Sequence, residues 1–272
     1  MSISNLIEKW DNIAFLNYNL IAWFLFWARY GRNRKYLLSN VELRDLHEGN
    51  RCFILLNGPS VKSLDVSKLS NEFVIATNYF YKTDFCDIVR PTYYCVADSH
   101  FFTNNDSEDN VNDLLEKCSY SKFIFNISFL SRFSKAISEN VYVAYSKHMP
   151  NLFRIRSNLC GFSSGFISVS MFAINVAIFM GFNSIYLLGY DFEPGILSHF
   201  YRDSNTEKKI KERQRKETEK DNVCGKYWQY SQAQYQNYYL SNYARRVGIG
   251  IYNCNPESYV RSFPFVDYEG LF

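Results

Sequence analysis

Four polar side chains that could bind a ligand stand at the ends of four separate apolar runs. They are Asn57, Asn78, Asp98 and Asp191, and each ends or follows a run rich in Ile, Leu, Val or aromatic residues. Short apolar runs of this kind predict buried strands of a parallel sheet. Ligands bind at the carboxyl ends of such strands, so the four side chains predict one shared site. Each of them alone would be an ordinary turn former.

The turn after the first run has the sequence Asn57-Gly58-Pro59-Ser60. Gly58 and Pro59 end the strand sharply, and Ser60 can cap the helical turn that follows. Backbone N–H groups at such a turn favour anions. We expect Asn57, Gly58 and Ser60 to bind the ligand, and an ordinary strand-to-helix turn is the alternative.

Groups that could transfer a proton or hold a metal are few. The chain has four histidines, at His47, His100, His148 and His199. It has no G-x-x-x-x-G-K-[ST] and no G-x-G-x-x-G loop. No two aspartates are spaced D-x-D, which is the metal clamp of many nucleotide-sugar transferases. A glycosyltransferase with this sequence is therefore expected to work without a metal and without a cofactor.

The elements that position these residues alternate between strands and helices. This alternation predicts a doubly wound parallel α/β sheet, a single Rossmann-like domain of the GT-A-like variety over residues 51–272. A buried apolar helix is expected to open at Ser163-Ser164-Gly165 and to end at Gly181, and a Tyr-rich helix is expected over Tyr227–Val247. Strands are expected at 51–56, 72–78, 91–98, 122–127, 141–145, 184–191 and 250–254.

Two segments stand outside this pattern. Residues 1–50 contain the apolar stretch Ala14–Ala28, followed by a basic run to Lys35 and a polar linker over Ser39–Asn50. The apolar stretch predicts a helix that either packs on the core or lies in a membrane interface. The highly charged region at about 193–226 predicts a lid over the site, with a solvated loop as the alternative.

Composition narrows the class of protein. The formal net charge is only +3, so a general nucleic-acid binder is excluded. The seven cysteines are scattered and show no C-x-x-C, which is typical of reduced thiols in a cytoplasmic protein. No secretory signal is evident at the N-terminus.

The polar turns also carry a resemblance. Five motifs occur in the order and approximate spacing of the Campylobacter-type sialyltransferases, and the resemblance covers roughly Arg51–Asp203 and returns weakly at Ile251–Ser258. It implies a metal-independent transferase that uses CMP-sialic acid and modifies lipooligosaccharide. The motifs are Asn57–Ser60, Ala76–Tyr81, Val96–Phe102, Ser163–Gly165 and Ile185–Phe192.

The resemblance implies roles for the residues that match. Asn57 and Gly58 correspond to the turn that holds CMP, and Asn78 to the amide that binds the donor sugar and phosphate. Ser163 and Ser164 correspond to the hydroxyl pair that binds the donor. Gly189 and Asp191 belong to the nucleoside-binding turn. Asp98 stands where the family has Asn, and a carboxylate there would repel an acidic sugar.

The catalytic positions match less well. The family's base lies before its last long helix, where this chain has no His between Lys226 and Gln232. Transfer needs a group that takes the acceptor proton and donors that stabilise the departing phosphate. We expect His199 to be the base, with His100 as the alternative. Tyr201 and Tyr230 are expected to hold the phosphate, with Tyr227 as the alternative.

These observations together predict an inverting glycosyltransferase. It would move sialic acid, or a related acidic sugar, from a CMP donor to a lipid-linked surface glycan such as lipooligosaccharide, O-antigen or capsule. We expect a cytoplasmic protein on the inner membrane, which could form a homo-oligomer and binds no nucleic acid. The alternatives are a pyrophosphokinase-like relative that handles ATP and a pterin, and a catalytically silent scaffold of a glycan-assembly complex.

Overall fold

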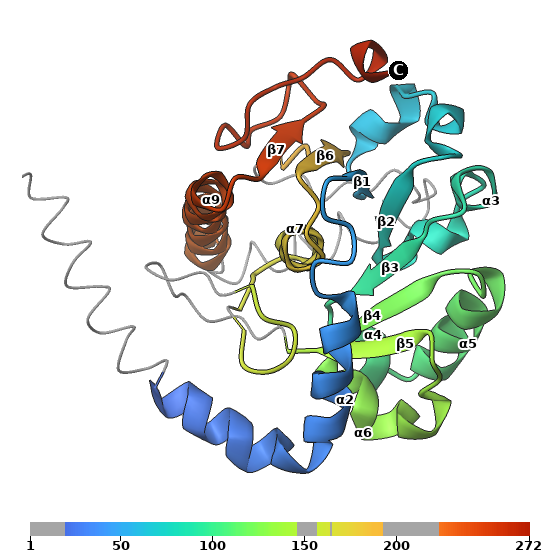
Figure 1. Ribbon diagram of the computed structural model, residues 1–272, viewed down its shortest axis with the longest axis vertical. Coiled ribbons are helices and arrows are strands. Elements are labelled where there is room, and N and C mark those ends of the chain that lie inside the picture. The colour runs from blue at the N-terminus through green and yellow to red at the C-terminus, as the bar shows by residue number, and fades with distance from the viewer. Residues whose placement is uncertain (1–19, 146–156, 164, 193–222) are drawn as a thin grey trace, which may run out of the picture.

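A single parallel sheet forms the centre of the molecule (Figure 1). The computed structural model describes residues 20–145, 157–163, 165–192 and 223–272. The sheet has seven strands in the order β5-β4-β3-β2-β1-β6-β7, and every pairing is parallel. The strands are β1 (Arg51–Leu55), β2 (Phe73–Thr77), β3 (Tyr93–Val96), β4 (Lys122–Asn126), β5 (Val141–Ala144), β6 (Ser184–Leu188) and β7 (Gly250–Asn253). The predicted fold class is confirmed, and Asn57, Asn78, Asp98 and Asp191 lie in the turns beyond β1, β2, β3 and β6.

The order of the strands creates one switch point. The chain moves from β1 to β5 on one side of the sheet and then returns to place β6 on the other side of β1. Ligands in doubly wound sheets bind at the carboxyl ends of the strands beside such a reversal. The turns after β1 and β6 are therefore the positions to inspect for a site.

The strands alternate their side chains between two apolar layers. Cys52, Ile54 and Ile75 lie in the core that contains α7 (Val169–Phe179) and is lined by α9 (Val223–Arg246). Phe53 and Leu55 lie in the core on the opposite face. Helices α3 (Phe85–Val89), α4 (His100–Thr103) and α5 (Ser107–Lys117) cover that second face (Figure 1).

Helix α7 begins later than the sequence predicted. Its N-cap is Ser168, whose Oγ accepts a hydrogen bond from the Met171 N–H (3.4 Å), and not the Ser163–Gly165 motif. The backbone N–H of Ile167 donates to the Gln236 side chain of α9 (2.9 Å). Because α9 supplies this acceptor, Ile167 is held outside the helix. The helix passes into a left-handed turn at Gly181 (φ 83°), as expected.

Helix α9 begins at Val223, four residues before the predicted start at Tyr227, so the last residues assigned to the lid belong to this helix. The remaining lid residues lie outside the described part of the chain. The shorter helical elements are α2 (Arg34–Leu38), α6 (Leu130–Phe133), η1 (Gly31–Asn33), η2 (Ser39–Leu43), η3 (Pro59–Ser63), η4 (Val66–Leu69), η5 (Asn78–Lys82), η6 (Ile127–Phe129), η7 (Ser134–Ala136) and η8 (Glu269–Leu271).

The predicted polar linker over Ser39–Asn50 is a packed part of the domain. Asn40 is fully buried, and its side-chain amide donates to the backbone carbonyls of Val143 (2.8 Å) and Leu159 (2.6 Å). His47 is also buried, and its Nε2 lies 2.6 Å from the Tyr93 hydroxyl. Two polar side chains of this segment, Asn40 and His47, therefore have buried partners and anchor it to the domain, whereas a linker would leave them in solvent.

Candidate functional site

The turns after β1 and β6 touch each other at two glycines. The Gly58 N–H donates to the Gly189 carbonyl (3.0 Å), which extends the contact of the two strands by one bond. A Cβ on Gly58 would lie 2.4 Å from that carbonyl oxygen, and Gly189 has a φ of 73°. Only glycine fits both positions, which explains why both turns contain it.

Asp191 joins three turns at this place. Its carboxylate accepts hydrogen bonds from the Ser60 backbone N–H (2.9 Å), from the Ser60 hydroxyl and from the Asn255 side-chain amide (2.7 Å). Ser60 follows β1 and Asn255 follows β7, so the carboxylate holds the turns after these two strands against the turn after β6. Asn255 was absent from the predicted site, although the weak motif at Ile251–Ser258 contained it. Asp191 and Ser60 thus meet as predicted, and they bind each other.

Asn57 lies at the carboxyl end of β1 with half of its amide unsatisfied. The side chain is buried, and its Nδ2 lies 3.4 Å from the Thr77 hydroxyl at the end of β2. Thr77 donates in turn to the Leu55 carbonyl (3.1 Å). The Asn57 Oδ1 has no hydrogen-bond donor among the described residues. A buried acceptor without a partner costs about 1–3 kcal/mol, so this oxygen is a candidate ligand contact.

Asn78 repeats the pattern at the end of β2. Its backbone is left-handed (φ 48°), and its buried Oδ1 also lacks a donor in the described structure. The Tyr94 hydroxyl donates to the Asn78 carbonyl (2.7 Å) and accepts from the Tyr81 N–H (2.8 Å). Burial raises the pKa of Tyr94 well above its ordinary value, so the hydroxyl keeps the proton that it donates. Tyr94, which the sequence did not single out, thus fixes the position of Asn78.

The Asp98 side chain forms a hydrogen bond within its own turn. It is exposed, and its carboxylate accepts a hydrogen bond from the His100 N–H (2.9 Å) at the start of α4. Burial, followed by the charges of Asp106 and Asp98, raises the pKa of Tyr79 in the turn after β2. The Asp98 charge therefore lies close to the β2 end of the site. His100, the alternative base, is exposed beside it.

Tyr230 reaches the site from α9. Its ring stacks on Phe192 at 5.2 Å and 22°, directly after Asp191, and its hydroxyl accepts from the Gln234 side chain (3.0 Å). Ser163 is buried two residues after Gly161. The other predicted residues of this group, Ser164, His199 and Tyr201, lie outside the described part of the chain.

Residues Gly161–Gly165 also fit the pattern G-x-S-x-G of serine hydrolases. That pattern requires the serine at a sharp turn between a strand and a helix. Ser163 follows no strand in the described structure, and the next helix begins only at Val169. The local structure therefore does not support a nucleophilic serine.

No group of three or more His, Cys, Asp or Glu in the described ranges could hold a metal ion.

Comparison with known proteins supports the fold alone. A scan against protein-family models and a search of curated sequences find no match. Among solved structures, the Campylobacter jejuni sialyltransferase CstII with cytidine-5'-monophosphate aligns with a TM-score of 0.50 and 18% identity, over 80% of this chain and 85% of that chain. The monofunctional alpha-2,3-sialyltransferase Cst-I from Campylobacter jejuni aligns with a TM-score of 0.50 and 18% identity, over 79% of this chain and 80% of that chain.

A variant of the sialyltransferase CST-II in complex with CMP aligns with a TM-score of 0.51 and 20% identity, over 79% of this chain and 86% of that chain. These neighbours share the parallel sheet with flanking helices that the motifs predicted. The chain therefore has the α/β fold of the Campylobacter jejuni sialyltransferases, which confirms at the level of the fold the resemblance seen in its sequence.

Proposed function

We propose that the protein is an inverting, metal-independent glycosyltransferase that transfers sialic acid or a related acidic sugar from a CMP donor to a surface glycan. The observation that carries the proposal is the pair of buried, unpartnered amide oxygens on Asn57 and Asn78. They follow adjoining strands, and one of these strands borders the switch point. The proposal is also supported by the structural neighbours, one of which is a sialyltransferase in complex with cytidine-5'-monophosphate.

The chemistry of the two oxygens suits a sugar nucleotide. An amide oxygen accepts hydrogen bonds, so its ligand must supply donors. Ribose hydroxyls, the cytosine amino group and sugar hydroxyls are such donors. Bound CMP-sugar would satisfy both acceptors, which would convert their desolvation cost in the free protein into affinity for the ligand.

The proposed reaction displaces CMP from the anomeric carbon. The acceptor hydroxyl attacks that carbon, the bond to the phosphate oxygen breaks, and a base takes the hydroxyl proton. We assign the base to His199, with His100 as the alternative. Tyr201 and Tyr230 are assigned to the departing phosphate, where hydroxyl donors stabilise the charge that develops. Tyr230 is suited to this role because it stacks on Phe192 beside the β6 turn.

CMP release and CMP binding test the proposal together. The full chain is mixed with CMP-Neu5Ac and a galactoside in the presence of EDTA, CMP release is measured, and calorimetry measures CMP affinity. Release that survives EDTA, with inversion at the anomeric carbon by NMR, is the expected result. Failure to bind CMP and to use any CMP-sugar would contradict it. Magnesium-dependent use of ATP would favour the pyrophosphokinase alternative, and binding without turnover would favour the scaffold.

The base is tested by two matched variants. His199→Ala is expected to lower kcat by about 10²-fold or more, because general base catalysis contributes factors of that order. His100→Ala should leave kcat within about twofold of the parent. The reverse result would move the base to the start of α4.

The acceptor and the location belong to the same proposal. A lipooligosaccharide, O-antigen or capsule precursor carries a lipid, so the enzyme would work at the cytoplasmic face of the inner membrane as a peripheral protein. A homo-oligomer is compatible with this arrangement.

A further inference from the structure

The N-terminal helix of residues 20–30 attaches to the domain by only part of its surface. Ala22 and Phe26, one turn apart, are 8% and 3% exposed. Phe26 packs edge-on against Tyr145 at 4.5 Å between ring centroids, and it shares a small apolar cluster with Ile127 and Leu37. The helix is therefore docked on the domain by one narrow stripe.

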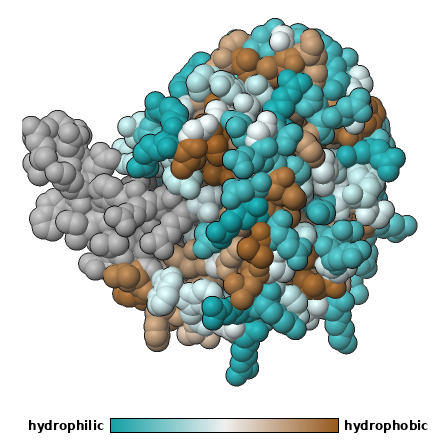
Figure 2. Space-filling model, viewed as in Figure 1, coloured by the Kyte–Doolittle hydropathy of each residue, from teal (hydrophilic) through white to brown (hydrophobic). Residues whose placement is uncertain are grey.

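The rest of the helix presents apolar side chains to solvent. Five of them are 48–67% exposed, and together we call them the lipid face: Leu20, Ile21, Trp23, Phe24 and Leu25. Figure 2 shows hydrophobic surface at the lower left of the view, where Figure 1 places this helix. Apolar side chains gathered on a single exposed helix are typical of a docking surface, since isolated surface apolar residues are scattered.

Charge identifies the partner. Four exposed basic residues follow the lipid face, and none of them pairs with a carboxylate of the described residues: Arg29, Arg32, Arg34 and Lys35. The sequence contains no Asp or Glu between Leu20 and Val41. An apolar helix with an exposed Trp and a dense basic flank complements the interface of an anionic bilayer. None of the described helices combines the length and apolar content that a bilayer span requires.

The helix also lies at a defined end of the sheet. Ile127 directly follows β4 and Tyr145 directly follows β5, so these two neighbours of Phe26 belong to the carboxyl edge. The Trp27 ring lies against Gly161, where an added Cβ would be 3.4 Å from it. Gly161 is two residues before Ser163, and Asn57 and Asn78 stand at the same edge. The lipid face and the candidate site therefore share one end of the molecule.

We propose that the lipid face and its basic flank bind an anionic bilayer and turn the carboxyl edge of the sheet toward the membrane surface. A lipid-linked acceptor would then meet the site without leaving the bilayer. This last step rests on the proposed function, whereas lipid binding and orientation do not.

Vesicle sedimentation of the full chain tests the lipid face. Vesicles of phosphatidylglycerol and phosphatidylcholine should pellet the protein, and pure phosphatidylcholine should pellet much less. Trp23→Ser/Phe24→Ser should lower the partition coefficient at least about tenfold, since two large apolar groups are lost. The matched control Ile88→Ser/Phe265→Ser changes two similarly exposed residues elsewhere and should bind like the parent. Arg32→Gln/Arg34→Gln/Lys35→Gln, which leaves only Arg29 of the basic flank, should strongly reduce the salt dependence of binding.

Several results would overturn the proposal. They are equal binding by the Trp23→Ser/Phe24→Ser variant, equal binding to neutral vesicles, and a dimer in light scattering that this variant dissociates while vesicles capture nothing. The last result would assign the lipid face to a second copy of the chain. CMP release from a soluble galactoside should be unchanged in the variant, so failure of catalysis and failure of lipid binding are separate results.

Hydrogen exchange tests the orientation. On anionic vesicles, amides of residues 20–38 and of the carboxyl-edge segment Ile127–Phe133 should exchange more slowly than in solution. Amides at the amino edge, in η4 and in residues 119–121, should be unaffected. Slower exchange at the amino edge in place of the carboxyl edge would contradict the proposed orientation.

Discussion

At the scale of single residues, Asn78 combines a backbone feature with a side-chain feature. It has a left-handed backbone, which costs most side chains energy, and a buried amide oxygen without a donor in the described structure. Asn tolerates the left-handed region better than other residues with a side chain, so the turn can present an amide where glycine would otherwise stand. The residue therefore serves its turn and still keeps a functional group for a ligand.

Substitution separates these two features. Asn78→Gly keeps the left-handed backbone and removes the amide, so we expect unfolding free energy within about 1 kcal/mol of the parent. CMP affinity should fall about tenfold, which corresponds to one lost hydrogen bond. Urea denaturation and calorimetry measure the two quantities. Asn78→Ala is the matched control, and it should lose the same affinity and be less stable because of backbone strain. Unchanged CMP affinity in both variants would remove Asn78 from the site.

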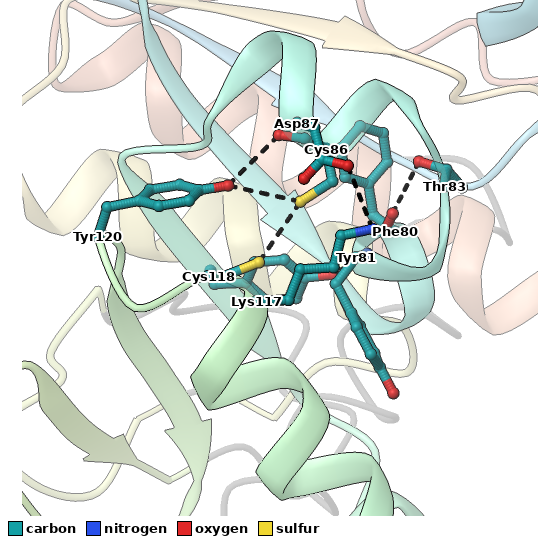
Figure 3. Close-up of polar contacts among 9 residues, drawn as sticks. Phe80, Tyr81, Thr83, Cys86, Asp87, Lys117, Cys118 and Tyr120 are labelled. Carbon is teal, nitrogen blue, oxygen red and sulfur yellow. Dashed lines mark hydrogen bonds and ion pairs between the residues drawn. The ribbon is translucent and has the colours of Figure 1, made fainter.

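A second residue-scale feature is a pair of close thiols. The Sγ atoms of Cys86 on α3 and Cys118 after α5 lie 3.4 Å apart, and the Tyr120 hydroxyl lies 3.7 Å from Cys86 Sγ (Figure 3). The hydrogen bond from Cys118 lowers the pKa of the Cys86 thiol, and the same bond, with burial, raises that of Cys118. Cys86 is therefore the thiol of the pair that ionises first.

We expect the oxidant diamide, which takes up one hydrogen from each thiol, to link this pair. Peptide mapping by mass spectrometry should find a disulfide between Cys86 and Cys118, because the thiolate is the attacking form and its partner is in contact. Cys86→Ser should abolish the link, and Cys52 and Cys95, whose thiol pKa values are raised by burial, should stay unlinked. A map in which Cys86 stays reduced while other pairs form would contradict the expectation.

At the scale of elements, the sequence predicted what depends on local pattern. The seven strands were predicted because each is a short apolar run, and Asn57, Asn78 and Asp191, which follow three of these runs, were placed correctly at one edge. The start of α7 was wrong because the acceptor for the Ile167 N–H is Gln236, on a helix that is distant in sequence. No local sequence pattern indicates a contact between residues so far apart in the chain.

The segment Ser39–Asn50 illustrates the same limit. Its polar composition predicted a linker, yet Asn40 donates to carbonyls of Val143 and Leu159 that are far away along the chain. A buried Asn and a solvated Asn look alike in a sequence. Within the site, Asn255 was overlooked for this reason, because its function is a hydrogen bond to Asp191.

His47, which lies in the same segment, makes the free energy of unfolding depend on pH. Burial, followed by the charge of Lys122, lowers the pKa of His47, whose ring stacks on Phe182 at 4.5 Å. In the unfolded chain this His titrates near 6.5. The contribution of His47 to the free energy of unfolding is therefore fully present above about pH 6.5. It falls as pH drops from there toward the lowered pKa, because the unfolded state binds the proton first.

Urea denaturation at several pH values measures this effect. One proton contributes at most about 1.4 kcal/mol of unfolding free energy per pH unit. His47→Phe should remove that contribution between about pH 5.5 and 6.5, and the exposed His100→Gln should keep it. If His47→Phe shows the parent's slope, the acid sensitivity has another source.

At the scale of the whole molecule, one side chain joins the first strand to the end of the chain. Arg51, at the start of β1, pairs with Glu72 through two hydrogen bonds (3.1 and 2.6 Å) and donates to the Leu271 carbonyl (3.0 Å). Its guanidinium also lies over the Phe272 ring at 5.5 Å from the centroid. The last residues are therefore held against the amino edge of the sheet, opposite the candidate site.

Loss of this side chain should loosen the end of the chain without affecting the site. Arg51→Met should lower the unfolding free energy by about 1 kcal/mol, because the pair is partly exposed and screened. Hydrogen exchange should be faster in residues 265–272, and CMP affinity should be unchanged. Lys62→Met, which removes an exposed charge, is the control and should match the parent. Loss of CMP affinity in Arg51→Met would show that the two edges are coupled.

The place of β1 in the sheet has a consequence for biosynthesis. β1 pairs with β2 on one side and with β6 on the other, and the Asp191 carboxylate that fastens its turn is itself held by Asn255. While only β1 to β5 have left the ribosome, the turn that carries Asn57 lacks its hydrogen bonds to Gly189 and Asp191, which come later in the chain. If the proposed nucleotide site is correct, it should form only when Asn255, which follows the final strand, has left the ribosome, and incomplete chains should then not compete with finished molecules for the proposed donor.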